Sequence, residues 1–298
     1  MPGQRRILFL TGTRADFGKL KSLMIAVNED PRFDCSIFVT GMHTLSAYGL
    51  TMMEVQQIGC SGLHVYMNQI LNEPMDMVLA NTVSGLARYV HENPPDMIIV
   101  HGDRVEAMAG AIVGAMRNIL VGHIEGGELS GTVDELIRHA TSKLSHIHFV
   151  ANAEAAQRLR QMGEKDETVF VVGSPDIDVM VSSALPTLES VKQYYEIAYG
   201  DYAIAMLHPV TTEVEQMEEH AAAFVDALLE SGQNYVVIYP NNDEGTSFIL
   251  HQYQRLKGNR RFRIFPSIRF ESFLVLMQNA RFIAGNSSAG IRAAPFYG

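Results

Sequence analysis

Short apolar runs alternate with amphipathic segments along this chain, and that alternation constrains the fold more than any other feature. The apolar run 97–100 is followed by an Ala- and Gly-rich helical segment, and further apolar runs follow at 119–124 and 147–150. Helical segments between short apolar strands are typical of βαβ units and a parallel sheet. The pattern predicts an α/β chain with these strands: 6–10, 34–40, 63–66, 97–100, 119–124, 147–150, 170–172, 202–207, 235–238, 262–264 and 282–284. It predicts helices that include 16–28, 45–58, 75–92 and 287–297.

A turn-rich stretch near the middle of the chain predicts a division into two domains. Ser182 and Ser183 precede Leu185-Pro186-Thr187, and a second βα series begins at about residue 202. Pro and clustered small polar residues mark turns and linkers. We therefore expect domains at 1–182 and 183–298.

Composition narrows the class of protein. The 298 residues are 47% hydrophobic, carry a net charge of −10, and contain no apolar run long enough to span a bilayer. An acidic chain lacks the basic footprint of a nucleic-acid-binding protein, so we expect neither nucleic acid nor membrane as a partner. Two cysteines without a CxxC spacing favour a cytoplasmic protein. His139, His146 and His148 lack a further well-placed ligand, so we expect no metal.

Four acidic residues follow two neighbouring predicted strands. Asp103 follows the run 97–100, Glu125 and Glu128 follow the run 119–124, and Asp134 lies in the first turn of the next helix. Ligands of α/β proteins bind at the carboxyl ends of the strands, where such carboxylates can act as general acids and bases. Helix caps and solvated loop acids are the alternative interpretation of the same residues.

Several strand-to-helix turns are suited to an anion. Gly12-Thr13-Arg14-Ala15-Asp16 is predicted to present free backbone N–H groups, with Arg14 as a further donor, and 285–292 places Ser287 and Ser288 at a helix start. His208 ends another strand, and Thr211 or Thr212 is predicted to cap the next helix with Glu213 in its first turn. Asn241 and Asn242 end a further strand. Ordinary turns and caps would use the same residue types.

Six motifs together resemble the hydrolysing UDP-N-acetylglucosamine 2-epimerase family, in the same order along essentially the whole chain. They are GTRAD, HGDR, HIEGGELSGTVDELIRHATSKLSHIH, HPVTTE, YPNND and GNSSAGIR. The resemblance implies two Rossmann-like domains in a glycosyltransferase-B-like architecture, with the active site in the interdomain cleft. It implies a UDP-sugar substrate, no cofactor, no catalytic metal and a homo-oligomer. Family members release UDP across C1–C2 of UDP-N-acetylglucosamine and hydrate the intermediate with inversion at C2, giving N-acetylmannosamine for sialic acid synthesis.

The resemblance also implies roles for particular residues. Asp103, Glu125 and Asp134 would transfer protons. The expected substrate and UDP contacts are Arg14, Arg104, His208, Asn241, Ser287, Ser288 and His43. Ala293 stands where family members carry a glutamate that binds the ribose hydroxyls, which predicts a weakened nucleotide site. Family chains also continue past this length, so we expect a C-terminally truncated member.

Other functions fit the same motifs. A hydrolysing 2-epimerase acting on UDP-2,4-diacetamido-2,4,6-trideoxyglucose, on the legionaminic acid route, would keep every motif. A non-hydrolysing UDP-N-acetylglucosamine 2-epimerase would return UDP-N-acetylmannosamine, although the EGGELSGTVDE segment fits the hydrolysing branch better. A non-catalytic sugar-nucleotide-binding module is the alternative from another class, favoured by Ala293.

Overall fold

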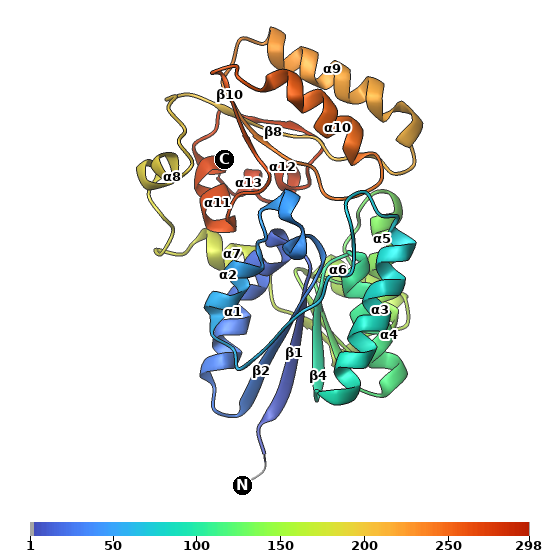
Figure 1. Ribbon diagram of the computed structural model, residues 1–298. Helices are drawn as coiled ribbons and strands as arrows, with labels where there is room; N and C mark the ends of the chain where they lie inside the picture. The colour runs from blue at the N-terminus through green and yellow to red at the C-terminus, as the bar shows by residue number, and fades with distance from the viewer. Residues whose placement is uncertain (1–2, 298) are drawn as a thin grey trace. The chain divides into compact units, whose positions relative to one another are not determined.

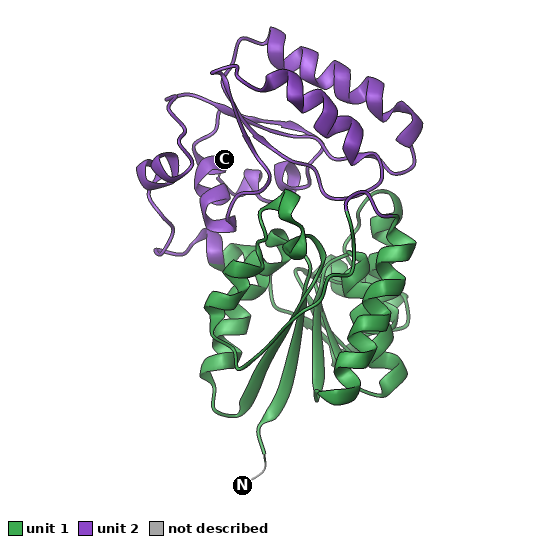
Figure 2. Ribbon diagram, in the orientation of Figure 1, with its two compact units in different colours: residues 1–70, 74–178 green, residues 71–73, 179–298 purple. Residues whose placement is uncertain are grey.

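A computed structural model describes residues 3–297, which divide into two compact α/β units (Figure 1). Unit 1 consists of 1–70 and 74–178, and unit 2 consists of 71–73 and 179–298 (Figure 2). Among the described residues, no helix combines the length and the apolar character that crossing a membrane requires.

Unit 1 is built on a seven-stranded sheet in the order β3-β2-β1-β4-β5-β6-β7, and every neighbouring pair is parallel. Its strands are β1 (Arg5–Thr11), β2 (Phe33–Val39), β3 (Gly62–Val65), β4 (Met97–His101), β5 (Leu120–Ile124), β6 (Ile147–Val150) and β7 (Val169–Val171). Its helices are α1 (Arg14–Glu29), α2 (Met52–Val55), α3 (Met75–Glu92), α4 (Val105–Arg117), α5 (Thr132–Lys143) and α6 (Ala153–Gln161), and α7 (Pro175–Met180) spans the division between the units.

Unit 2 is built on a four-stranded parallel sheet in the order β10-β9-β8-β11. Its strands are β8 (Ala203–Met206), β9 (Tyr235–Ile238), β10 (Phe262–Phe265) and β11 (Ile283–Gly285). Its helices are α8 (Leu188–Tyr194), α9 (Met217–Glu230), α10 (Thr246–Tyr253), α11 (Phe270–Gln278), α12 (Ala289–Arg292) and α13 (Ala294–Tyr297).

The alternation along β1 shows why unit 1 needs helices on both faces of its sheet. Phe9 packs in one cluster with Leu20 of α1, whereas Leu8 and Leu10 pack in another with residues of α3 and α4. Successive strand residues point to opposite faces, so a strand that is apolar throughout must be covered on both sides. In Figure 1, α1 lies on one side of β1 and β4, and α3 and α4 lie on the other. The predicted α/β class is confirmed.

Two predicted helices are broken in the structure. The segment 45–58 contains only short helical turns and α2, because Gly49 and Leu50 adopt the left-handed conformation at φ of 85° and 48°. The segment 287–297 forms the separate four-residue helices α12 and α13. Pro295 has no backbone N–H to bond the carbonyl of Ile291, so one continuous helix cannot form there.

Candidate functional site

The carboxyl ends of β4, β5 and β7 bring buried charged side chains together in unit 1. Glu125 follows β5 directly, is 1% exposed, and holds a left-handed backbone conformation at φ 59°. Its carboxylate lies 3.0 Å from Lys19 Nζ of α1 and accepts a hydrogen bond of 2.6 Å from Ser174 Oγ, just past β7. His101 Nε2, at the end of β4, lies 3.0 Å from Glu125 Oε2. A strained, fully paired carboxylate of this kind is typical of a functional site.

A second carboxylate shares the same lysine. Asp176 Oδ2 lies 3.1 Å from Lys19 Nζ, and the Ser174 hydroxyl can donate its one proton to the Asp176 carboxylate in place of Glu125. The side chains of Lys19 and Asp176 are only 12% and 10% exposed, so water screens this ion-pair cluster weakly. One lysine therefore holds two buried acids at the strand ends.

Arg138 organises the neighbouring carboxylate. Its guanidinium, which is almost fully buried, pairs with the Asp103 carboxylate after β4 and donates a 2.7 Å hydrogen bond to the carbonyl oxygen of Glu125. Glu128 lies 3.9 Å away. Asp134 lies in the first turn of α5, as predicted, and is exposed. Because Asp134 and Arg138 are four residues apart on α5, both lie on one face of that helix.

A buried histidine, His123, fixes the turn that leads to Asp103. His123 of β5 is fully buried, with Nε2 2.8 Å from the carbonyl oxygen of Gly102 and Nδ1 3.0 Å from Ser142 Oγ. Since the carbonyl oxygen only accepts, Nε2 carries the ring proton and donates it. Burial lowers the pKa of His123 to about 3, so the ring is neutral and holds the turn that leads to Asp103.

The predicted anion turn after β1 differs from expectation. The Asp16 carboxylate accepts the backbone N–H groups of Gly12 at 2.9 Å and Thr13 at 3.0 Å, and the Thr13 hydroxyl accepts from the Asp16 N–H in a capping box. The prediction that this turn offers those N–H groups to a ligand is therefore wrong, because an internal anion uses them. Arg14 forms a two-point ion pair with the Glu54 carboxylate.

Two further candidates of unit 1 also have defined partners. Arg104 Nε lies 3.3 Å from the Glu106 carboxylate, and Arg138 pairs with the Asp103 carboxylate. His43 is completely buried, with its ring nitrogens 3.1 Å from Thr11 Oγ1 and 2.6 Å from Thr51 Oγ1. Burial lowers the pKa of His43 to about 4.

In unit 2 the ends of three adjacent strands converge. His208 follows β8, Asn241 follows β9, and Asn286 follows β11. The backbone N–H of Asn241 donates to His208 Nδ1 at 3.2 Å, and the N–H of His208 donates to Asn286 Oδ1 at 2.7 Å. Asn286 Nδ2 returns a 2.9 Å hydrogen bond to the carbonyl oxygen of His208. The structure thus joins two predicted site residues, and Ser287 and Ser288 follow directly.

Capping in unit 2 departs from the prediction. Neither Thr211 nor Thr212 caps a helix: α9 starts at Met217, and Glu213 precedes a single 3-10 turn. Ser288 is the N-cap residue of α12 but its side chain makes no capping hydrogen bond, while Ser287 Oγ accepts a 3.4 Å bond from the N–H of Ala289. Asn242 is buried and its side-chain oxygen accepts from the N–H of Asn72 at 2.9 Å.

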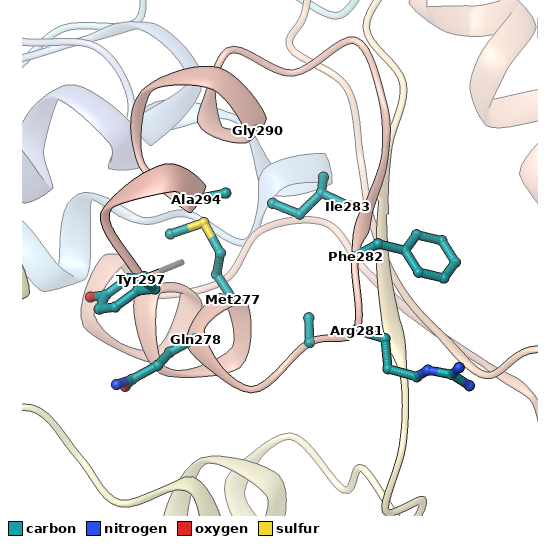
Figure 3. Close-up of a pocket in the computed structure, with 9 residues that line it drawn as sticks. Met277, Gln278, Arg281, Phe282, Ile283, Gly290, Ala294 and Tyr297 are labelled. Atoms are coloured by element: carbon teal, nitrogen blue, oxygen red, sulfur yellow. The ribbon is translucent and has the colours of Figure 1, made fainter.

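A small pocket of about 190 Å³ lies elsewhere in unit 2 (Figure 3). Met277, Ile283 and Ala294 face one another there, whereas Arg281 and Phe282 point away. The lining residues are Met277, Gln278, Ala280, Arg281, Phe282, Ile283, Gly290, Ala294 and Tyr297. The lining contains no carboxylate or histidine among the residues that the structure describes.

Sequence reasoning missed Lys19, His101, Arg138, Ser174 and Asp176 as members of the site. The rule that strand ends carry the site would have found His101, Ser174 and Asp176, because each follows or ends a strand of the sheet. Lys19 and Arg138 come from helices, and their positions give no such signal. Among the described residues, no group of three or more His, Cys, Asp or Glu side chains is arranged to hold a metal ion.

Comparisons with known proteins agree on one family. The family model described as UDP-N-acetylglucosamine 2-epimerase matches residues 25–298. A UDP-N-acetylglucosamine 2-epimerase of Neisseria meningitidis serogroup B is 54% identical over 99% of this chain and 78% of that protein. A UDP-N,N'-diacetylbacillosamine 2-epimerase (hydrolyzing) of Legionella pneumophila is 36% identical over 98% of this chain and 79% of that protein. The predicted C-terminal truncation stays a prediction.

A solved structure supports the same fold. The UDP-GlcNAc 2-epimerase of Methanocaldococcus jannaschii, in complex with UDP-GlcNAc and UDP, superimposes with a TM-score of 0.78 over 95% of this chain and 79% of that chain. At 21% sequence identity this similarity shows the shared two-domain α/β architecture.

Proposed function

The chain belongs to the UDP-N-acetylglucosamine 2-epimerase family, and on that premise we propose that it is the hydrolysing form, converting UDP-N-acetylglucosamine and water to N-acetylmannosamine and UDP. The observation that carries the proposal is the placement of Asp103 and Glu125 after adjacent strands, each carboxylate held by a nearly buried cation. Proton transfer at C2 and to water requires acids and bases held at fixed positions. The Legionella relative, whose name specifies hydrolysis, supports the hydrolysing assignment.

The three acids differ in access, and we propose that they differ in role. Asp103 is partly exposed and Asp134 is exposed, so both can exchange protons directly with substrate and water. Glu125 is buried, and takes part through His101, whose Nε2 lies 3.0 Å from its carboxylate. In this scheme a base removes the C2 proton as UDP leaves from C1, and water then adds with inversion at C2.

The proposed diphosphate ligands are distributed over both units. In unit 1 they are Arg14 and Arg104, which would exchange their present carboxylate partners for phosphate, with which guanidinium forms two-point contacts. His43 is also a proposed contact; because it is buried, it would influence the ligand indirectly, through its hydrogen bond to Thr11 or Thr51.

In unit 2 the proposed ligands are His208, Asn241, Ser287 and Ser288, supported by their common position at the carboxyl ends of β8, β9 and β11. Negatively charged phosphate is stabilised by hydroxyl and N–H donors at such strand ends. A homo-oligomer that takes a UDP-sugar, without a cofactor or metal, remains part of the proposal.

Neutral variants of Asp103 and Asp134 test the assignment. Asp103→Asn and Asp134→Asn should each lower kcat for UDP release by about 10²- to 10⁴-fold, the usual contribution of a general acid or base. Glu29→Gln is the matched control, since Glu29 is an exposed carboxylate at the C-terminal end of α1, which leads into the amino end of β2 and not to the carboxyl ends of the strands. Folded variants that retain wild-type kcat would remove Asp103 and Asp134 from the mechanism.

A second substrate is supported by the Legionella relative, which is named for UDP-N,N'-diacetylbacillosamine. The two substrates differ in an acetamido group at C4 and the missing hydroxyl at C6. Direct competition between them, with each product quantified by mass spectrometry, decides the assignment by the ratio of the two kcat/KM values. We expect the ratio to favour UDP-N-acetylglucosamine, in line with the 54% identical Neisseria enzyme.

A further inference from the structure

The two cysteines of this chain lie against each other. Cys35 belongs to β2 and is 3% exposed, and Cys60 lies in the turn before β3 and is partly exposed. Their sulfur atoms are 2.9 Å apart and share a hydrogen bond. The sequence contains no other cysteine, so any disulfide within one chain must join these two.

The sheet fixes this proximity. Strands β2 and β3 pair in parallel with Ser36 opposite Gly62, which places Cys35 and Cys60 beside each other at the start of the paired segment. A side chain in place of Gly62 would lie 2.8 Å from the Ser36 Cβ, so the two strands pack closely here. A disulfide has an S–S bond of about 2.05 Å, so the sulfur atoms need to move less than about 1 Å to form one.

The environment divides the two thiols into an attacking and a resolving group. The hydrogen bond between the two thiols lowers the pKa of Cys60, while the same hydrogen bond and burial raise the pKa of Cys35. The neighbouring Asp34 carboxylate opposes ionisation of both thiols. The more accessible sulfur is thus the one that ionises first, as in cysteines that react with oxidants.

We propose that Cys35 and Cys60 form a reversible redox pair that hydroperoxides oxidise to an intramolecular disulfide. The Cys60 thiolate attacks one peroxide oxygen and breaks the O–O bond, giving a sulfenic acid and, with hydrogen peroxide, one water molecule. The Cys35 sulfur then attacks the Cys60 sulfur, and the sulfenic oxygen leaves with a proton as a second water. The two thiols lose two electrons and the peroxide gains them.

The bond would close the segment between Cys35 and Cys60, which carries Glu54, the ion-pair partner of Arg14. Oxidation would therefore restrict the movement of a segment attached to a proposed substrate contact. Detection of the disulfide itself needs no activity measurement, so its failure is distinguishable from failure of the proposed function.

The test is oxidation of the reduced full chain by hydrogen peroxide, followed by denaturation, alkylation of free thiols and intact-mass measurement. We expect both thiols to disappear together, the chain to lose two hydrogen atoms, and dithiothreitol to restore both. The reaction should be at least about tenfold faster in the native chain than in concentrated urea, because the fold aligns the reacting atoms. Cys35→Ser should instead leave a Cys60 sulfenic acid that dimedone traps.

Three results would overturn the proposal. They are a stable Cys60 sulfenic acid in the wild-type chain with Cys35 still alkylated, disulfide-linked dimers in place of the intramolecular bond, and equal rates in native buffer and urea. A second readout is the urea midpoint of unfolding, which should rise on oxidation and return on reduction. A midpoint that falls on oxidation would show that the native fold does not accommodate the bond.

Discussion

Replacing Lys19 by methionine should destabilise unit 1 strongly. Lys19 Nζ lies 3.0 Å from Glu125 and 3.1 Å from Asp176, and all three side chains are at most 12% exposed. Breaking a buried ion pair by removing one partner costs about 3–5 kcal/mol, because the remaining charge is left without compensation. Glu125 keeps His101 and Ser174 nearby, so we expect a loss near the lower limit, about 3 kcal/mol, or more than a hundredfold in the unfolding equilibrium.

The assay is urea unfolding followed by far-UV circular dichroism, since the chain contains no tryptophan. Lys165→Met is the matched control: Lys165 is an exposed lysine of the same unit, and its replacement should change the stability by no more than about 0.5 kcal/mol. Adding Asp176→Asn to Lys19→Met should recover about 1 kcal/mol, because one of the two stranded carboxylates is removed.

Either of two outcomes would contradict a buried, shared ion pair at Lys19. One is a Lys19→Met chain as stable as the Lys165→Met control. The other is a double variant whose loss equals or exceeds the sum of the two single losses, which would mean that Lys19 and Asp176 are not coupled.

Three further predictions concern the two buried histidines, Ser142 and Ala293. His43 and His123 have pKa values of about 4 and about 3 in the folded chain but bind protons in the unfolded chain below about pH 6.5. The free energy of unfolding should therefore fall by about 1.4 kcal/mol per pH unit for each histidine as the pH drops from about 6.5 to 4. ¹⁵N NMR of the imidazoles at pH 5 should show neutral rings, and protonated rings would contradict this. Ser142→Ala should cost about 1 kcal/mol in urea unfolding by removing the partner of His123 Nδ1, and an unchanged midpoint would disprove that contribution. Ala293 is 6% exposed and packs in an apolar cluster of unit 2, so Ala293→Glu should lower the urea midpoint of unfolding by burying a carboxylate among apolar side chains. An unchanged midpoint would contradict this.

Local patterns were sufficient to predict the strands and to select two candidate carboxylates at their carboxyl ends. The apolar runs predict the strands because a strand covered on both faces is apolar throughout, and the strand-end rule selects Asp103 and Glu125. The pattern could not supply Lys19, which lies 106 residues from Glu125 in the chain, because that pairing depends on how α1 packs on the sheet.

The turn after β1 shows a second limit of the sequence. Gly12-Thr13-Arg14-Ala15-Asp16 fits an anion site and a capping box equally well, and only the structure shows that the Asp16 carboxylate accepts the N–H groups of Gly12 and Thr13. The break in the predicted helix 45–58 could not be predicted either, because Leu50 adopts a positive φ that its residue type does not indicate.

The most direct test of the proposed hydrolysing activity is to incubate the chain with UDP-N-acetylglucosamine in D₂O and follow the products by NMR. We expect free UDP and free N-acetylmannosamine in equal amounts, with deuterium at C2 of the sugar, because the C2 proton is lost to a base and replaced from solvent. UDP-N-acetylmannosamine without free UDP would show the non-hydrolysing reaction. Unchanged substrate, in a chain that binds UDP in a separate titration, would show a binding protein, and either result would contradict the hydrolysing assignment.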